Sequence, residues 1–118
     1  MKTAYAEIKP FVTKDRSTIR ELMHPARHAA SAVSFAEATV EAGNTTVMHF
    51  HRNSEEIYHV TGGTGTMRLG AAEFDIYQGD TIFIAPGMLH NVTNTGRDAL
   101  KILCVSNPPY ADDDTELT

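Results

Sequence analysis

Residues 31–106 alternate between short segments of strand-favouring residues and turns that contain glycine or asparagine. The segments are four to six residues long and rich in β-branched and aromatic side chains, which suit a pleated, half-buried surface. Glycine supplies positive φ in the turns, and asparagine tolerates it. No ten-residue helical period interrupts the pattern, so we expect an all-β sandwich or barrel. The expected strands are 47–51, 56–60, 66–69, 73–77, 81–84 and 100–105.

The flanking segments are less regular. A chain of 118 residues fits one domain, 1–118, which we divide into an N-terminal arm (1–30), a β core (about 31–106) and an acidic C-terminal tail (108–118). In the arm, Thr18 and Glu21 fit a capping box for one helical turn, but 18–22 reads equally as an edge strand, and extended structure is favoured. The tail holds two prolines and four acids, so we expect it to be loosely held, with some order at 108–110 if Tyr110 packs.

Charge and cysteine content narrow the partners and the compartment. The net charge is −5, but four acids lie in the tail, and the rest carries eleven acids against ten bases spread from Lys2 to Lys101. A nucleic-acid partner would need a clustered basic face, so none is expected. Cys104 is the single cysteine and cannot form an internal disulfide. With no apolar run near the ~18 residues of a membrane span and no signal-like segment, we expect a soluble, cytoplasmic protein without a membrane partner.

Histidine is the residue type that suggests chemistry, with six in the chain. His49 and His51 lie two residues apart on an expected strand, so their side chains leave the same face about 6.6–7 Å apart. Imidazoles placed this way can converge on one metal at about 2.1 Å. Glu56 begins the next expected strand after a polar turn and can lie opposite them. His90 follows the Pro86-Gly87 turn, which can direct a fourth ligand inward.

Two longer patterns contain these residues. Gly43, five residues, His49-Phe50-His51, four residues, Glu56, six residues and Gly63 together resemble the first motif of the cupin superfamily. Gly79, then Pro86-Gly87, two residues, His90, three residues and Asn94 resemble the second motif. Ala85 departs from the family pattern, which usually has proline there, but Pro86 follows directly. The match covers about 50 residues in the middle of the chain.

This resemblance implies a small single-domain cupin, a jelly-roll β-barrel with an extended N-terminal arm and a metal inside the barrel. It implies His49, His51, Glu56 and His90 as the metal ligands. The family spacing favours Glu56 over Glu55, which would then point outward. Three imidazoles and one carboxylate suit one divalent transition metal per chain, whether Mn, Fe, Co, Ni, Cu or Zn. Six-coordinate geometry would leave two adjacent positions open, whereas structural zinc is closed by four ligands.

Strand parity predicts the surroundings of this site. Tyr58 shares the face of Glu56, either as a catalytic proton donor or as an aromatic wall residue. Cys104 is expected to be a small buried hydrophobe, and Arg68 could pair a substrate carboxylate only if its strand is read in the other register. Outward-facing Met48 and Phe50 suggest cover by the arm or by a second subunit. The expected pocket-wall residues are Met67, Phe74, Ile76, Phe83 and Met88.

Fold alone does not fix function, and the resemblance leaves two function classes open. The first is a metal-dependent enzyme of dioxygenase, decarboxylase, lyase or isomerase type, acting on a small oxygenated molecule chelated at the metal. The second is a non-catalytic binding or sensing protein in which the metal anchors a small ligand or stabilises the barrel. A phosphosugar isomerase would need several basic residues at the mouth of the pocket to bind the phosphate. The nearly neutral net charge of the chain outside the tail does not favour this activity. A homodimer is expected for a small cupin.

Overall fold

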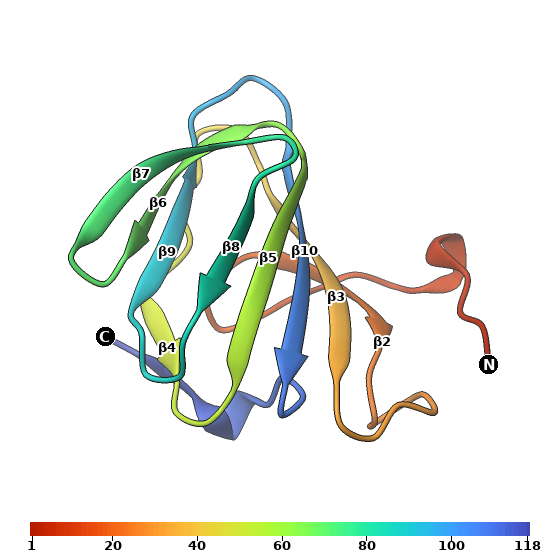
Figure 1. Cartoon of the computed structure of the whole chain (residues 1–118). Coiled ribbons are helices and arrows are strands. Elements are labelled where there is room, and N and C mark those ends of the chain that lie inside the picture. Colours follow the sequence, from red (N-terminus) through yellow and green to blue (C-terminus); the bar gives the residue numbers. More distant parts are fainter.

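The computed structural model describes residues 1–118 as two antiparallel sheets packed against each other (Figure 1). The six-stranded sheet contains, in spatial order, β1 (Phe11–Val12), β2 (Thr18–Met23), β3 (Ser34–Val40), β10 (Leu100–Asn107), β5 (Glu55–Gly62) and β8 (Thr81–Ile84). The five-stranded sheet contains β11 (Thr115–Leu117), β4 (His49–His51), β9 (His90–Asn94), β6 (Thr64–Leu69) and β7 (Ala72–Tyr77). Two 3₁₀ turns, η1 (Tyr5–Glu7) and η2 (Asp112–Asp114), complete the elements. The predicted all-β class is confirmed.

No strand pairing joins the edges of the two sheets, so the expected closed barrel is not formed. The edge strands β1, β8, β11 and β7 each have one neighbour only. β1 and β11 are also short, with two and three residues, and offer few backbone groups for a further ladder. The fold is therefore a two-sheet arrangement, with its core between the facing sheets.

The core follows from the alternation of side chains along the strands. In β10, the side chains of Leu100, Ile102 and Cys104 are buried, and β10 lies between β3 and β5, as its apolar character predicts. β6 and β7 contribute Met67 and Ile76 from the opposite sheet, both almost completely buried. Burial of apolar side chains from both sheets provides the main driving force for their packing.

Several strand boundaries differ from those expected. The 81–84 strand is confirmed, whereas the expected 47–51 strand shortens to β4. Asn94 ends β9, a strand that is not among those expected, and its side chain is buried. Its side-chain amide donates hydrogen bonds to the carbonyl oxygens of Val40 and Asp98, both at 2.8 Å. A polar side chain satisfied in this way can occupy a strand interior, which local turn propensity does not anticipate.

Both flanking segments belong to the sheets. The preference for extended structure in the arm is confirmed, because β2 pairs with β3 in the six-stranded sheet. The expectation of a loosely held tail is wrong, since β11 pairs with β4 and places Thr115 opposite His51. In Figure 1 the C-terminus accordingly lies beside β4, whereas the N-terminal end projects past β2 on the other side.

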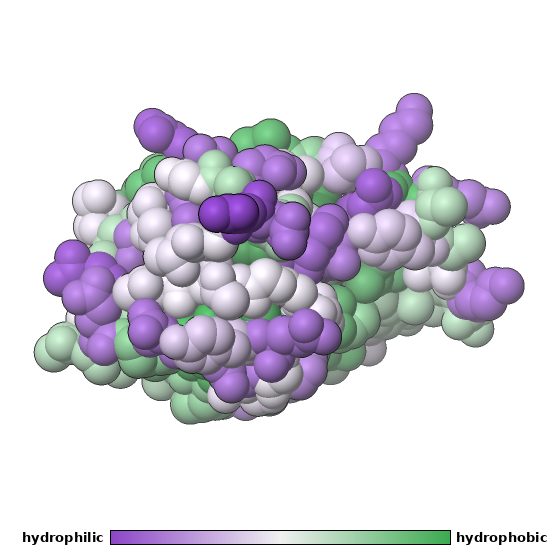
Figure 2. Space-filling view, turned by 90° about the horizontal axis from the view of Figure 1, so that it is seen from above, coloured by the Kyte–Doolittle hydropathy of each residue, from purple (hydrophilic) through white to green (hydrophobic).

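The surface and the helical segments are consistent with this packing. Figure 2 shows one face on which hydrophilic side chains project, while hydrophobic residues are visible between them and along the rim of the view. Neither 3₁₀ turn has the length or the apolar character that crossing a membrane as a helix would require.

Candidate metal centre

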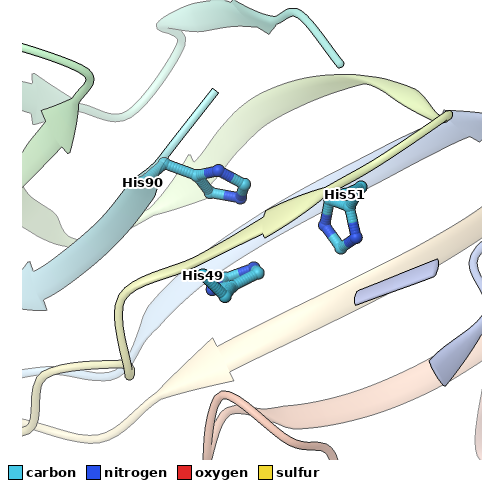
Figure 3. Close-up of side chains that lie close together, drawn as sticks. All are labelled: His49, His51 and His90. Carbon is cyan, nitrogen blue, oxygen red and sulfur yellow. The ribbon is translucent and has the colours of Figure 1, made fainter. Parts of the chain in front are cut away.

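Three histidine rings meet between the sheets (Figure 3). His49 and His51 come from β4 and His90 from the first position of β9, and all three are buried. One nitrogen from each ring lies within 4.8 Å of the others. Strand periodicity explains the first two, because residues two apart share a face. His90 joins them because β4 and β9 pair with His49 directly opposite His90.

The turn before β9 fixes the approach of His90. Gly87 has a φ of +78°, and its backbone N–H donates to the carbonyl oxygen of His51 at 2.7 Å. A positive φ is accessible to glycine at no steric cost, so this position suits the residue that occupies it. The turn thus forms with Ala85 in place of the usual proline, and it ties the chain before His90 to β4.

In each of the three rings, Nδ1 contacts an oxygen atom of the protein, so that Nε2 is the nitrogen left for a ligand. The Nδ1 atoms of His49 and His90 lie 2.8 Å and 2.9 Å from the carbonyl oxygens of Val47 and Met88. The Nδ1 atom of His51 lies 3.0 Å from Thr115 Oγ1, whose hydroxyl donates to a backbone carbonyl. Each contact is satisfied when Nδ1 carries the proton, and this tautomer leaves Nε2 with a free lone pair for a metal.

Glu56 lies beside the three rings, on the inward face of β5, whereas Glu55 is exposed. Its Oε1 atom is 3.2 Å from Nε2 of His51 and 3.7 Å from Nε2 of His90. The Ser106 hydroxyl donates to the other carboxylate oxygen at 3.3 Å. The choice of Glu56 over Glu55 as the inward residue agrees with this geometry.

Two of these atoms have no hydrogen-bond partner. They are Oε1 of Glu56 and Nε2 of His90, in residues that are 5% and 0% exposed. Buried polar atoms are normally satisfied, because desolvation without a partner costs free energy. A cation between the carboxylate oxygen and the imidazole lone pairs would satisfy both atoms. The three imidazoles could hold a metal ion, and the Glu56 carboxylate lies beside two of them.

The protonation states suit this role. Burial, followed by repulsion from His49, lowers the pKa of His90 to about 4, so its ring is neutral at pH 7, as a metal ligand must be. Burial and the nearby Glu56 carboxylate raise the pKa of the Tyr58 hydroxyl well above its ordinary value. The same two causes raise the pKa of the Cys104 thiol. Tyr58 and Cys104 therefore stay protonated, and Cys104 is the buried, unreactive thiol that the sequence predicts.

A cavity opens beside the histidines, and its walls are not the ones expected. Met67 and Ile76 pack in the core away from it, Phe83 and Met88 are exposed, and Phe74 packs against the core. The apolar lining comes mainly from β1, β2, β3 and β10, with Val92 added from β9. Its aliphatic, phenylalanine and cysteine members are Phe11, Ile19, Phe35, Ala36, Ala38, Val40, Val92, Ile102 and Cys104. Tyr58 also lines the cavity, whereas Arg68 is exposed on β6 and does not. The wall assignment fails because the sequence does not show that the N-terminal arm folds over the site.

Asp15 is a site residue that the sequence analysis missed. Its Oδ1 atom accepts hydrogen bonds from the Thr13 hydroxyl at 2.8 Å and from the backbone and hydroxyl of Ser17 at 2.9 Å and 2.6 Å. Its Oδ2 atom lies 3.8 Å from Nε2 of His49. The local turn can be predicted from the sequence, because an aspartate followed two residues later by serine is a common turn pattern. The contact of Asp15 with His49 cannot be predicted in this way, because the two residues are 34 positions apart in the chain.

The C-terminal segment closes the site on the other side. Thr115 contacts His51, and the ring of Tyr110 meets the His51 ring edge-on, with centroids 5.8 Å apart. Asp114 anchors this segment, because its carboxylate accepts hydrogen bonds from the backbone and side chain of Asn53 and from the backbone of Ser54, at 2.9–3.1 Å. These contacts explain why an acidic segment is ordered: its carboxylate is bound by the turn before β5.

Replacement of Asp114 by alanine is expected to destabilise the protein by about 1–2 kcal/mol and to loosen β11, because three hydrogen bonds are lost. Burial works to raise the pKa of Asp114, but hydrogen bonds from Ser54 and Asn53 outweigh it and hold the pKa below its ordinary value. The stabilisation is therefore complete at neutral pH and is lost as the pH falls through the folded-state pKa. Denaturant unfolding and amide exchange of β11 measure both effects. Asp113→Ala, at an exposed neighbour, is the control, and equal unfolding midpoints for the two variants would refute the anchoring role.

Comparisons with known proteins agree with the fold. An uncharacterized protein of Methanocaldococcus jannaschii is 48% identical over 117 residues, covering 99% of this chain and 94% of its own length. A predicted oxalate decarboxylase of Thermotoga maritima superposes with a TM-score of 0.80 at 24% identity, over 92% of this chain and 99% of that one. The Streptomyces nucleoside dehydratase Pac13 superposes with a TM-score of 0.81 at 16% identity, over 100% of this chain and 90% of that one. At these identities the two structures show the fold alone.

The family assignment rests on the sequence match together with this structural likeness. The family model described as "Cupin domain" matches residues 36–106, which include β4, β5 and β9 and all four of the residues gathered at the centre. The chain therefore belongs to the cupin family.

Proposed function

We propose that His49, His51, His90 and Glu56 hold one divalent transition metal and that the protein is a metal-dependent enzyme acting on a small oxygenated molecule. The observation that carries the proposal is the pair of unpartnered buried atoms, Glu56 Oε1 and His90 Nε2, in a cluster of three histidines that adjoins a cavity. Buried groups with unsatisfied lone pairs are characteristic of a ligand site rather than of a structural core.

The residues around the cluster have separable roles in this proposal. When bound, such a metal supplies Lewis-acid polarisation or activation of dioxygen. The Nδ1 contacts hold the three rings in orientation, and the Ser106 hydroxyl holds one oxygen of Glu56. Tyr58 lines the cavity with its ring edge-on to His90, at 5.8 Å between centroids. Its hydroxyl, kept protonated by burial, can donate a hydrogen bond to a bound molecule, which makes Tyr58 the candidate catalytic residue.

A second function, binding or sensing without conversion, is favoured by the walls of the cavity. About half of the lining residues are hydrophobic, and both Tyr58 and Cys104 are held in their protonated forms. A cavity of this kind can retain a small molecule at the metal without transforming it.

The deciding experiment counts metal per chain in protein purified without a chelating column and then measures turnover across hydroxy acids, diols and sugars. An enzyme loses turnover when the metal is stripped and regains it on reloading. Tyr58→Phe is expected to reduce turnover while leaving metal content unchanged. Turnover unaffected by stripping would refute the metal-dependent mechanism, and binding without conversion across the panel would favour the second function.

Two further parts of the proposal concern assembly and compartment. Met48 and Phe50, which the sequence suggested as a dimer surface, do not support a dimer. Both side chains are half-buried, and β11 pairs with β4, the strand that contains Phe50. A homodimer is instead supported by Ile57 and Phe83, apolar cross-strand partners on β5 and the edge strand β8 that are 42% and 55% exposed. A monomer by light scattering at micromolar concentration would contradict it.

A cytoplasmic location is supported by the free thiol of Cys104.

A further inference from the structure

The charged side chains that line the cavity all have the same sign. Among the lining residues, Asp15, Glu21 and Glu56 are acidic, and none is lysine or arginine. Glu21 comes from β2 and faces the ring of His24, with 3.4 Å between its carboxylate and Nε2. An uneven distribution of charge in a cavity favours ligands of one charge over another, because desolvated charges interact more strongly there than in water.

The basic residues close in sequence to the cavity-lining segments do not themselves line the cavity. Lys14, next to Asp15, donates to two backbone carbonyls of the C-terminal segment at 2.6 Å and 3.0 Å. The guanidinium of Arg20 lies over the ring of Tyr5, at 4.5 Å from its centroid. Arg27 is exposed, and its guanidinium lies 5.8 Å from the centroid of the Phe11 ring. The acidic lining is thus not neutralised by a cation inside the cavity.

Asp15 is the carboxylate best placed to act on a bound molecule. Its side chain is only 14% exposed, and three hydrogen bonds fix one oxygen. The other oxygen, 3.8 Å from Nε2 of His49, has no such partner and faces the histidine cluster. The carboxylates of Asp15 and Glu56 together balance the two positive charges of a divalent metal. Any anionic ligand would then add negative charge beside Asp15 and Glu21.

We propose that this cavity takes a neutral or cationic oxygenated molecule and discriminates against carboxylates and phosphates, with Asp15 as the residue that sets this preference. The proposal deepens the proposed function, because it presumes a metal at the histidines. Like charges a few ångströms apart in a desolvated site are a common device for rejecting the wrong ligand. This preference is the opposite of the one that the metal alone would give, because a divalent cation by itself binds a carboxylate more tightly than a neutral amide.

The test compares the affinities of the protein for lactate and for lactamide. Both molecules offer a hydroxyl and a carbonyl oxygen on the same carbon skeleton, but lactate is an anion and lactamide is neutral. Binding is measured by the visible spectrum of cobalt-loaded protein. The wild-type protein is expected to bind lactate no more tightly than lactamide. Asp15→Asn is expected to raise the affinity for lactate by at least about tenfold and to change that for lactamide by less than about threefold. Asparagine keeps an oxygen to accept the bonds from Thr13 and Ser17.

Glu73→Gln, at an exposed acid on β7, is the control that changes net charge equally and should leave the affinity ratio unchanged. A wild-type protein that prefers lactate by tenfold, an unaltered ratio in Asp15→Asn, or no response to either probe would each overturn the inference. Failure to bind cobalt at all would instead contradict the proposed function. The same probes in a thermal-shift assay on metal-free protein would then test the charge preference of the cavity by itself.

Discussion

His90→Ala is expected to weaken binding of a divalent transition metal by more than about 100-fold, so that the purified protein carries almost none. The substitution removes the imidazole whose unpartnered Nε2 lies 3.7 Å from the Glu56 carboxylate, and no neighbouring side chain replaces it. Loss of residues that merely orient ligands costs about 10- to 100-fold in affinity, and loss of a ligand costs more. Elemental analysis and competition with a chelator of known affinity measure the change.

Two further variants separate metal loss from misfolding. His59→Ala is the matched control, because His59 lies on β5 with an exposed side chain and contacts Thr81 rather than the centre. Glu56→Gln preserves the shape of the carboxylate and removes its charge, so it should also weaken metal binding without opening a cavity. Full metal content in both His90→Ala and Glu56→Gln would show that this cluster is not the metal site. Circular dichroism of the metal-free variants establishes that they are folded.

Stripping the metal is expected to lower the melting temperature by roughly 10 °C. A ligand present at 100 times its dissociation constant stabilises the folded state by about 2.7 kcal/mol. In a domain of this size, each kcal/mol corresponds to about 4 °C. Differential scanning calorimetry before and after dialysis against a chelator measures the shift, and reloading should reverse it. Identical melting curves in both states would mean that the metal does not stabilise this fold.

The metal-free protein should also lose stability as the pH falls from about 6.5 to about 4. The unfolded chain binds a proton at His90 near the ordinary pKa of 6.5, whereas burial lowers the folded-state pKa to about 4. Between these values the unfolded state binds more protons, so acidification favours unfolding, and above them His90 has no effect. Melting temperatures of the stripped protein at pH 8, 6 and 5 test this, and a flat profile would contradict a neutral, buried His90.

Local periodicity predicts the centre of this protein well. The i, i+2 spacing places His49 and His51 on one face, and the same parity turns Glu56 and Tyr58 inward while Ile57 is exposed. These relations hold because a strand has a period of two whatever its partners are. The turn at Pro86-Gly87 is likewise local, since it depends on a glycine with positive φ.

The rest of the site depends on contacts between distant segments. Asp15 lies beside His49, and Thr115 lies 64 residues from its hydrogen-bond partner His51. No local pattern encodes such pairings, because they result from how the arm and the tail pack on the sheets. The expected pocket wall is wrong for the same reason: Phe83 has a strand-like sequence environment, yet its face of the sheet is not covered.

The residues that touch the histidines from outside the 36–106 core have an evolutionary consequence. The histidine cluster lies within residues 36–106, which match the family model, whereas Asp15 and Thr115 come from the two flanks. Substitutions at these two positions can alter what lies beside the histidines while the buried apolar side chains between the sheets stay the same. Ligand choice and foldability can therefore drift separately in such proteins, and two chains with the same histidine motif need not share a substrate.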